Sequence, residues 1–250
     1  MIAQVWSCGG GTQSAAIAAL IVQGLLPTPD HSLIVDTKRE RASTWEYVNT
    51  VLRPALSAVG VNLVRVDRDD YTDTDLYGGE DGKSLLLPMY TAPAGKMPAF
   101  CSGEWKRDVA SRYMRNTLGL TNVVNWIGYS TDEMRRVSTP RRKWLQLRYP
   151  LIEDFPSSRD RCKAIVRAMG WPEPPRSSCY MCPHHSDAEW RDIKNNHPDD
   201  FAKAIAMEKD VRASDDGVYL HPSRRTLDSI DFSEDAGLWR GSECIGECFT

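Results

Sequence analysis

The sequence lacks any long apolar run, and none of its apolar stretches approaches the roughly 20 residues that a helix needs to span a bilayer. It also lacks a large excess of either charge, because 31 Lys and Arg residues face 34 Asp and Glu residues and leave a net charge of -3. That balance does not mark the whole chain as a nucleic-acid binder. The first residues have no basic region or cleavage site of a signal peptide. From these absences we expect a cytoplasmic protein with no membrane partner.

Two familiar nucleotide-binding motifs are absent as well. The Walker loop needs Gly-Lys followed by Ser or Thr, the dinucleotide fingerprint needs G-x-G-x-x-G, and neither follows the first apolar segment. A glycine cluster, Gly9 to Gly11, stands there instead, just before an Ala-rich helical segment. Glycine lets a ligand approach the backbone closely, and the N–H groups at a helix start attract anions. We therefore predict that residues 8–14 bind the phosphate groups of a nucleotide.

Apolar segments and helical segments alternate before residue 155. Five short apolar segments are typical of strands, at residues 2–6, 33–35, 61–66, 123–128 and 145–151. Helical patterns separate most of them, at residues 14–25, 43–60 and 104–118. This order predicts an α/β fold with a mostly parallel five-stranded sheet, helices on both faces, and ligands at the carboxyl ends of the strands. Residues 69–99, rich in Gly and Pro, are predicted to form an irregular cover over the substrate.

The last part of the chain has helical patterns alone, at residues 159–169, 187–195 and 200–211. We therefore expect a nucleotide-binding α/β core at residues 1–155 and a helical, cysteine-bearing section at residues 156–250. Seven cysteines in a chain expected in the cytoplasm argue against a disulfide framework and for metal or thiol chemistry. The spacing Cys179-x-x-Cys182 is typical of a metal ion or of two corners of an iron–sulfur cluster.

Four ordered motifs resemble one known superfamily. The loop Ser7-Cys-Gly-Gly-Gly-Thr-Gln-Ser14 resembles the pyrophosphatase loop (PP-loop), usually S-G-G-x-D-S, of the adenine nucleotide alpha-hydrolases, in a form seen in some relatives of phosphoadenosine phosphosulfate (PAPS) reductase. Asp36-Thr37, Cys101 to Lys106, and Gly128 to Arg136, a G-x-x-x-D-E-x-x-R segment, resemble further motifs of the same superfamily. The cysteine pair at 179 and 182 and the closing Glu-Cys-Ile-Gly-Glu-Cys carry the resemblance to the end of the chain.

The resemblance implies a Rossmann-like fold and a site for ATP with Mg²⁺. The nucleotide-binding residues it implies are Ser7, Gly9, Gly10, Gly11, Thr12, Gln13, Ser14, Asp36, Thr37 and Gly128. The catalytic residues it implies are Lys106, Asp132, Glu133 and Arg136, with Lys106, Arg107 and Arg136 neutralising phosphate charge. Gln13 stands where the family usually has aspartate, and a neutral amide does not hold Mg²⁺ as a carboxylate does. In the resemblance, Asp132 and Glu133 are the residues that could supply the missing carboxylate for ATP cleavage. Without the resemblance, they are equally well explained as acidic residues favoured at a helix N-terminus.

The resemblance also implies a [4Fe-4S] cluster on Cys101, Cys179 and Cys182. Ser102 replaces the second cysteine of the family's pair, so the missing ligand is Cys244 or Cys248, or one iron stays open for a sulfur species. Zinc bound by four thiolates is the redox-inert alternative. We expect Cys8 and Cys162 to pack in the core and the adjacent His184 and His185 to be surface residues; His221 has no assigned role.

Three functions remain open from the sequence. The first is an enzyme that uses ATP to adenylate a substrate and release pyrophosphate, with sulfur transfer to a nucleic-acid base or backbone, or to a small molecule, if a cluster is present. The second is a sulfonucleotide reductase acting on adenosine phosphosulfate or PAPS, although Gly-Leu-His does not follow Cys244 as it does in reductases. The third is a non-catalytic nucleotide sensor with structural zinc. We expect a homo-oligomer in each case.

Overall fold

The structure, a computed structural model, describes residues 2–79, 82–93, 95–140 and 142–233. By its internal contacts the chain forms two compact units. Within the described residues, the first unit comprises 2–73 and 102–177, and the second comprises 74–101 and 178–233. This division differs from the one expected at residue 155. Residues 156–177 belong with the α/β core, and residues 74–101 belong with the C-terminal section.

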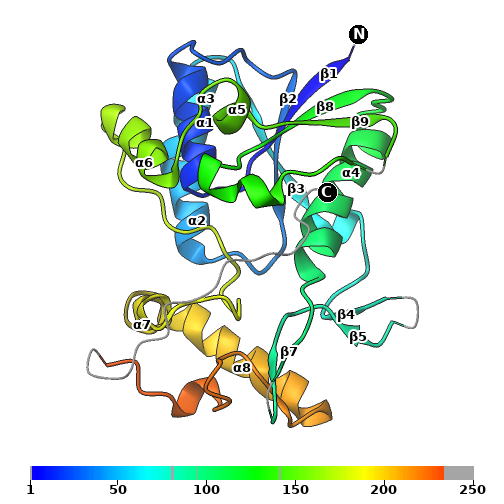
Figure 1. The fold of residues 1–250 in the computed structure, drawn as a ribbon, viewed down its shortest axis with the longest axis vertical. Helices are drawn as coiled ribbons and strands as arrows, with labels where there is room; N and C mark the ends of the chain where they lie inside the picture. The colour runs from blue at the N-terminus through cyan, green and yellow to red at the C-terminus, as the bar shows by residue number, and fades with distance from the viewer. Residues whose placement is uncertain (1, 80–81, 94, 141, 234–250) are drawn as a thin grey trace. The chain divides into compact units, whose positions relative to one another are not determined.

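The first unit is built on a five-stranded parallel sheet in the order β3-β2-β1-β8-β9 (Figure 1). The α/β fold with a parallel five-stranded sheet is therefore confirmed. Strand β1 pairs with β2 on one side and with β8 on the other, so the carboxyl ends of β1 and β8 flank a topological switch point. The strands are β1 (Ala3–Ser7), β2 (His31–Asp36), β3 (Leu63–Asp67), β8 (Val123–Ile127) and β9 (Leu145–Arg148).

Helices cover both faces of this sheet because successive strand residues point to opposite sides. Trp6 and Ile34 face a core shared with α1 (Thr12–Val22) and α6 (Arg159–Ala168). Their neighbours Val5 and Leu33 face a second core shared with α4. Figure 1 shows α1, α3 and α6 on one side of the sheet and α4 on the other. The other helical segments are α2 (Ala42–Tyr47), η1 (Val48–Leu52), α3 (Arg53–Ser57), η2 (Arg68–Asp70), η3 (Gly103–Asp108), α4 (Val109–Arg112), η4 (Tyr113–Thr117), η5 (Thr131–Arg136) and α5 (Pro150–Glu153).

Helix α6 explains why the first unit extends beyond residue 155. Its Cys162 and Val166 are fully buried in the same core as α1, whose residues from Ser14 to Ile21 are all buried. A helix that is apolar on nearly every side needs cover from more than the sheet. Helix α6 supplies this cover to α1, and residues 156–177 therefore fold with the first unit.

The second unit combines two helices with small antiparallel sheets. Helices α7 (Asp187–Asn196) and α8 (Pro198–Ser214) pack on each other, and the rings of Trp190, Phe201 and Phe232 lie within 6.5 Å of one another. The strands are β4 (Tyr77–Gly78), β5 (Ser84–Leu85), β6 (Tyr90–Thr91), β7 (Gly95–Lys96) and β10 (Val218–Tyr219), followed by a helical turn, η6 (Leu227–Ser229). The expectation of no strand after residue 157 is wrong, because β10 pairs with β6 from the segment expected to be irregular.

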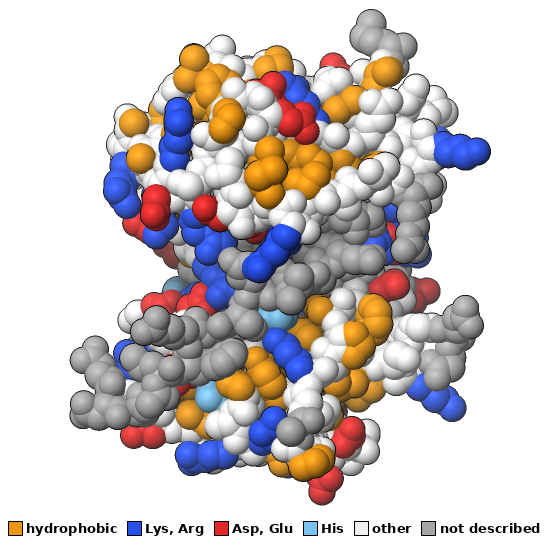
Figure 2. All heavy atoms as spheres, viewed as in Figure 1, with side chains coloured by type: hydrophobic (Ala, Val, Ile, Leu, Met, Phe, Trp, Pro, Cys, Tyr) orange, Lys and Arg blue, Asp and Glu red, His pale blue; other side chains and the backbone are white. Residues whose placement is uncertain are grey.

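The surface carries both charges. In the view of Figure 2, Lys, Arg, Asp and Glu side chains are interspersed with apolar ones, as the near-neutral composition predicts. None of the helices in the described part of the chain is long and apolar enough to cross a membrane.

Candidate functional site

The glycine loop leaves β1 and is held against β2 by its first residue. The Cys8 N–H donates to the Leu33 carbonyl at 2.8 Å, and the Gly9 N–H donates to the Ser14 hydroxyl at 2.8 Å. Gly10 has a φ of 76°, and a Cβ built on it would lie 2.9 Å from Thr44 Cγ2. Only glycine combines this backbone conformation with such close packing. The loop therefore needs glycine at this position for reasons of local structure.

Ser177 lies directly on the loop. Its hydroxyl donates to the Gly9 carbonyl, and a Cβ built on Gly11 would be 3.2 Å from the Ser177 Cβ. Gly11 is also the N-cap of α1, with no side-chain capping hydrogen bond and no acidic residue in the first turn. A helix N-terminus of this kind has backbone N–H groups that favour an anion. The loop and the helix start thus form the type of arrangement predicted for phosphate binding.

A polar network joins the start of α1 to the segment after β8. The Gln13 Nε2 donates to Glu133 Oε2 at 2.7 Å, and Arg136 Nη1 lies 2.5 Å from Glu133 Oε1. Glu133 is buried and completes a capping box with Ser130 at the start of η5. Arg136 also lies over the ring of Tyr129, with 4.3 Å between the guanidinium carbon and the ring centroid. Gln13, Glu133 and Arg136, which we predicted to act at one site, are thus brought together at the switch point.

Gly128 and Asp132 have different surroundings. A Cβ built on Gly128 would lie 3.5 Å from Gln13 Cβ and 3.6 Å from the Ser14 nitrogen, so this glycine permits close packing of β8 against the start of α1. Asp132 is exposed, and its Oδ2 accepts the Arg159 N–H at 2.5 Å. Gly128 therefore lies beside the loop, whereas Asp132 caps the start of α6.

Asp36 and Thr37, at the carboxyl end of β2, are both buried. Asp36 Oδ1 accepts the Lys38 N–H at 2.8 Å, and Arg65 forms an ion pair with Asp36 Oδ2. The backbone of Lys38 has a φ of 62°, which is uncommon for a residue with a side chain. The carboxylate of Asp36 therefore fixes the turn that follows β2.

Lys106 lies against the segment after β2. Its ammonium group is 2.5 Å from Oε1 of Glu40, a carboxylate that is almost entirely buried. The neighbouring Trp105 is buried too, and the guanidinium carbons of Arg39 and Arg68 lie 5.4 and 5.6 Å from its ring centroid. This group of charged side chains around one indole was not predicted. Its sequence signal was a run of four charged residues, Lys38 to Arg41, which is more commonly a solvated turn.

Two cysteines are core residues, as predicted. Cys8 and Cys162 are buried. Burial raises the pKa of Cys8 to about 11, against smaller opposing effects of the Gly10 backbone and the Ser14 hydroxyl. Burial, with a smaller contribution from Asp132, raises the pKa of Cys162 to about 12. Both thiols are protonated near neutral pH and are poor nucleophiles there.

Three other cysteines lie in the second unit. Cys101, Cys179 and Cys182 are partly exposed, and the Cys182 N–H donates to the Cys179 carbonyl at 3.1 Å, which closes a turn. Among the described residues, no group of three or more His, Cys, Asp or Glu side chains could hold a metal ion. Cys244 and Cys248, the other predicted ligands, lie outside the described residues. The thiols suit soft metal ions in their donor chemistry, and the described part of the chain does not assemble a complete ligand set.

The prediction that His184 and His185 are surface residues is wrong. Both are buried; His185 Nε2 lies 3.0 Å from the Cys179 carbonyl, and its ring packs edge-on against Trp190 at 4.7 Å. His221 is buried as well, with Nε2 lying 2.8 Å from Asp187 Oδ1. Adjacent histidines in a polar turn carry no sequence signal of burial, and the ring that packs against His185 belongs to α7, the helix that follows.

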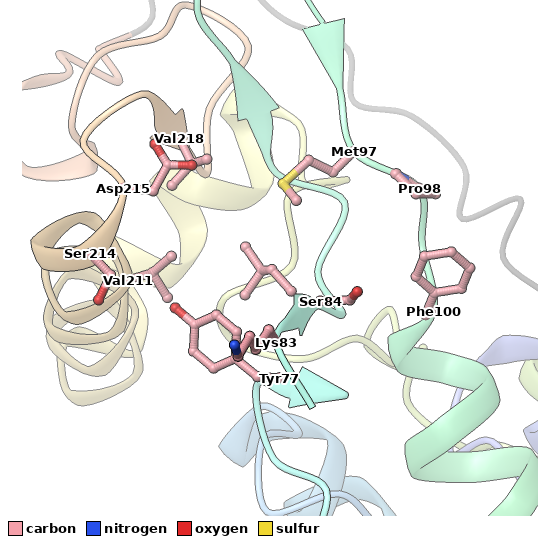
Figure 3. Close-up of a pocket in the computed structure, with 11 residues that line it drawn as sticks. Tyr77, Lys83, Ser84, Met97, Pro98, Phe100, Val211, Ser214, Asp215 and Val218 are labelled. Atoms are coloured by element: carbon pink, nitrogen blue, oxygen red, sulfur yellow. The ribbon is translucent and has the colours of Figure 1, made fainter. Parts of the chain in front are cut away.

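The second unit also has a cavity of about 380 Å³. Figure 3 shows its lining between the β4–β5 hairpin, the segment around Met97 and Phe100, and the end of α8. Tyr77 and Phe100 are exposed there, and Lys83 and Asp215 bring one charge of each sign. The volume is within the range of small-molecule sites. None of the predicted site residues contributes to this cavity.

Comparison with known proteins gives a distant structural likeness. No family model matches the chain, and a search of curated proteins found no match. Among solved structures, the chain is similar to the U34-tRNA thiolase NcsA from Methanococcus maripaludis with its [4Fe-4S] cluster. The identity is 13%, the TM-score is 0.46, and the match covers 92% of this chain and 73% of the other.

Proposed function

We propose that this chain is a PP-loop enzyme that binds ATP at the switch point of the first unit and transfers the adenylyl group to an acceptor, with release of pyrophosphate. The observation that carries the proposal is the network of Gln13, Glu133 and Arg136 beside the glycine loop. It places an amide, a carboxylate and a guanidinium next to a helix start that favours anions. Ligands of open α/β sheets bind at such a switch point.

Each side chain then has a distinct task. The backbone of residues 9–12 and the start of α1 hold the phosphate groups, and Arg136 compensates the charge that develops on them. Gln13 donates to a phosphate oxygen in exchange for its bond to Glu133. Asp36 and Thr37 hold the turn beside the loop where the adenosine would lie. Most of the rate enhancement comes from positioning and from charge compensation, because adenylyl transfer needs little covalent chemistry from the protein.

Glu133 and Asp132 are carboxylates, the donor type that Mg²⁺ prefers. Among the described residues they are not part of a group of three or more side chains that could hold a metal ion, and Asp132 accepts the Arg159 N–H. When bound, the ion would neutralise part of the phosphate charge. The Glu133 carboxylate already accepts from Gln13 and pairs with Arg136, so its role is to orient both side chains around the nucleotide. Lys106 pairs with Glu40 and serves, in this proposal, to balance phosphate charge.

Sulfur transfer is the finer part of the proposal. We propose that Cys101, Cys179 and Cys182 bind a [4Fe-4S] cluster whose fourth iron is either bound by Cys244 or Cys248 or left open, with four-thiolate zinc as the alternative. In the form with an open iron, the cluster would supply sulfide, which would displace AMP from an adenylated nucleic-acid base, nucleic-acid backbone or small molecule. The measurement is anaerobic purification followed by an absorbance spectrum and by iron and zinc analysis. About four irons per chain support the cluster; stoichiometric zinc without colour contradicts it.

The adenylation step has its own test. Purified protein with ATP and Mg²⁺ is assayed for release of pyrophosphate, and for binding of the non-cleavable analogue α,β-methylene-ATP. We expect Glu133→Gln to keep the fold, weaken the ion pair with Arg136, and lower pyrophosphate release by about tenfold or more. Asp228→Asn, an exposed carboxylate of the second unit paired with Lys209, is the control and is expected to act as wild type. Wild-type protein that binds no adenine nucleotide would refute the proposal.

A further inference from the structure

Ser177 stands at a junction that no sequence motif marked. It is the last residue of the first unit before the chain passes into the second, and it lies two residues before Cys179. Its hydroxyl donates to the Gly9 carbonyl, and its backbone nitrogen lies 3.4 Å from the position of a Cβ at Gly11. One residue therefore contacts two of the three glycines of the loop and adjoins the cysteine turn along the chain.

We propose that Ser177 couples the cysteine turn at Cys179–Cys182 to the glycine loop, so that the state of the turn sets the conformation of the loop. The peptide between Gly9 and Gly10 is planar, so a hydrogen bond that fixes the Gly9 carbonyl also fixes the direction of the Gly10 N–H. Gly10, with a φ of 76°, has glycine's freedom to adopt other conformations once this bond is lost. The Ser177 hydroxyl thus selects one loop conformation among several.

The chain on the N-terminal side of Ser177 is fixed to the first unit. Tyr47 donates its hydroxyl to the Pro172 carbonyl at 3.1 Å, and Glu173 pairs with Lys163 at 2.6 Å. Prolines at 172, 174 and 175 limit the backbone further, because each one locks its φ. This segment has few ways to absorb a displacement that reaches Ser177 from the other side.

The C-terminal side leads directly into the turn. The Cys179 carbonyl accepts from the Cys182 N–H at 3.1 Å and lies 3.0 Å from His185 Nε2, so the backbone of the turn is defined by its own contacts. A change in what Cys179 and Cys182 hold alters this backbone, and only one residue separates Cys179 from Ser177. Displacement of Ser177 by a few tenths of an ångström weakens its hydrogen bond to Gly9, because hydrogen bonds depend steeply on geometry.

The test reads the loop directly, by hydrogen–deuterium exchange of the amides of residues 8–14 in the full chain. The variants are Cys179→Ser, Ser177→Ala and the double variant. Cys179→Ser and Ser177→Ala are each expected to speed exchange at Gly9 and Gly10, whose N–H groups donate to the Ser14 hydroxyl and the Cys8 thiol, by about fivefold or more, the low end of typical coupling between sites. The double variant is expected to exchange no faster than Ser177→Ala alone, since the path from Cys179 runs through Ser177.

A control in the second unit separates this coupling from nonspecific effects of substitution. Asp228→Asn weakens the exposed ion pair with Lys209 and touches none of the contacts of Ser177, so exchange of the loop is expected to stay as in wild type. Denaturant unfolding of each variant confirms that the loop, and not the whole unit, has changed. Wild-type exchange in Cys179→Ser, or effects that multiply in the double variant, would overturn the coupling.

The effect of this coupling on nucleotide binding rests on the proposed function. A second measurement tests the coupling and the proposed function separately. The affinity for α,β-methylene-ATP is measured on the same four proteins and is expected to fall with faster loop exchange. If exchange shows the coupling and no protein binds the analogue, the proposed function fails and the coupling holds. If the analogue binds equally to wild type and Cys179→Ser and their loop exchange is equal, the coupling fails and the proposed function holds.

Discussion

Replacement of Gly10 by alanine tests whether the glycine loop is packed as the structure has it. The new Cβ would lie 2.9 Å from Thr44 Cγ2 and 3.3 Å from Ile34 Cδ1, closer than normal carbon contacts, at a residue with φ of 76°. The left-handed conformation costs a residue with a Cβ about 1–2 kcal/mol. Overpacking adds about 1–3 kcal/mol. Alanine also stiffens the unfolded chain, which offsets about 0.4–1 kcal/mol, so we expect Gly10→Ala to lower the free energy of unfolding by about 1–4.6 kcal/mol.

Gly24→Ala is a matched control for this prediction. Gly24 follows α1 with a φ of 70°, and a Cβ built on it meets nothing within 4 Å. It carries the same conformational cost as Gly10→Ala and the same gain from a stiffer unfolded chain, about 0.4–1 kcal/mol. The difference between the two variants isolates the overpacking cost of about 1–3 kcal/mol.

The assay is urea unfolding followed by tryptophan fluorescence, which the buried Trp6 and Trp126 of the first unit report. We expect a clearly lower midpoint for Gly10→Ala than for Gly24→Ala, with similar slopes. Affinity for α,β-methylene-ATP is expected to fall only in Gly10→Ala. Equal midpoints for the two variants would refute the close packing of Gly10 against Thr44 and Ile34.

Three further predictions concern buried polar groups. Cys8 and Cys162, with pKa values raised to about 11 and about 12, are expected to escape iodoacetamide at about pH 8 in the folded protein and to react after denaturation, as read by peptide mass mapping. Glu208→Ala is expected to lower the free energy of unfolding by about 2–4 kcal/mol, because the Glu208 carboxylate accepts the Leu220 and Leu227 N–H groups at 2.8 and 2.7 Å. A decrease below about 0.5 kcal/mol would contradict this expectation. Burial raises the pKa of Glu208 above 4.5, so ionisation of this carboxyl favours the unfolded chain. The stability of wild type relative to Glu208→Gln is therefore expected to be highest below about pH 4.5 and to decline as the pH rises through the folded-state pKa. A relative stability that increases with pH would show that folding lowers this pKa instead.

Much of the first unit follows from local sequence pattern. All five predicted sheet strands exist, and the helix expected at residues 104–118 is present as the helical segments from Gly103 to Thr117. The positions of Gly9 to Gly11 between β1 and α1 are also as predicted. These features depend on residues close in the chain, whose periodicity and glycine content already favour a strand, a turn or a helix. The roles assigned to the site residues stay predictions.

Tertiary structure alone decided which distant residues meet. Gln13 and Glu133 are 120 positions apart, and Ser177 and Gly9 are 168 apart, so no local pattern relates them. Helix α6 joined the first unit because α1 is buried on nearly every side. By itself, the sequence determined the glycine loop and the order of strands and helices, since each is encoded within a few turns of chain. The contacts around that loop depend on the packing of whole elements, where burial of apolar surface, and not local propensity, sets the partners.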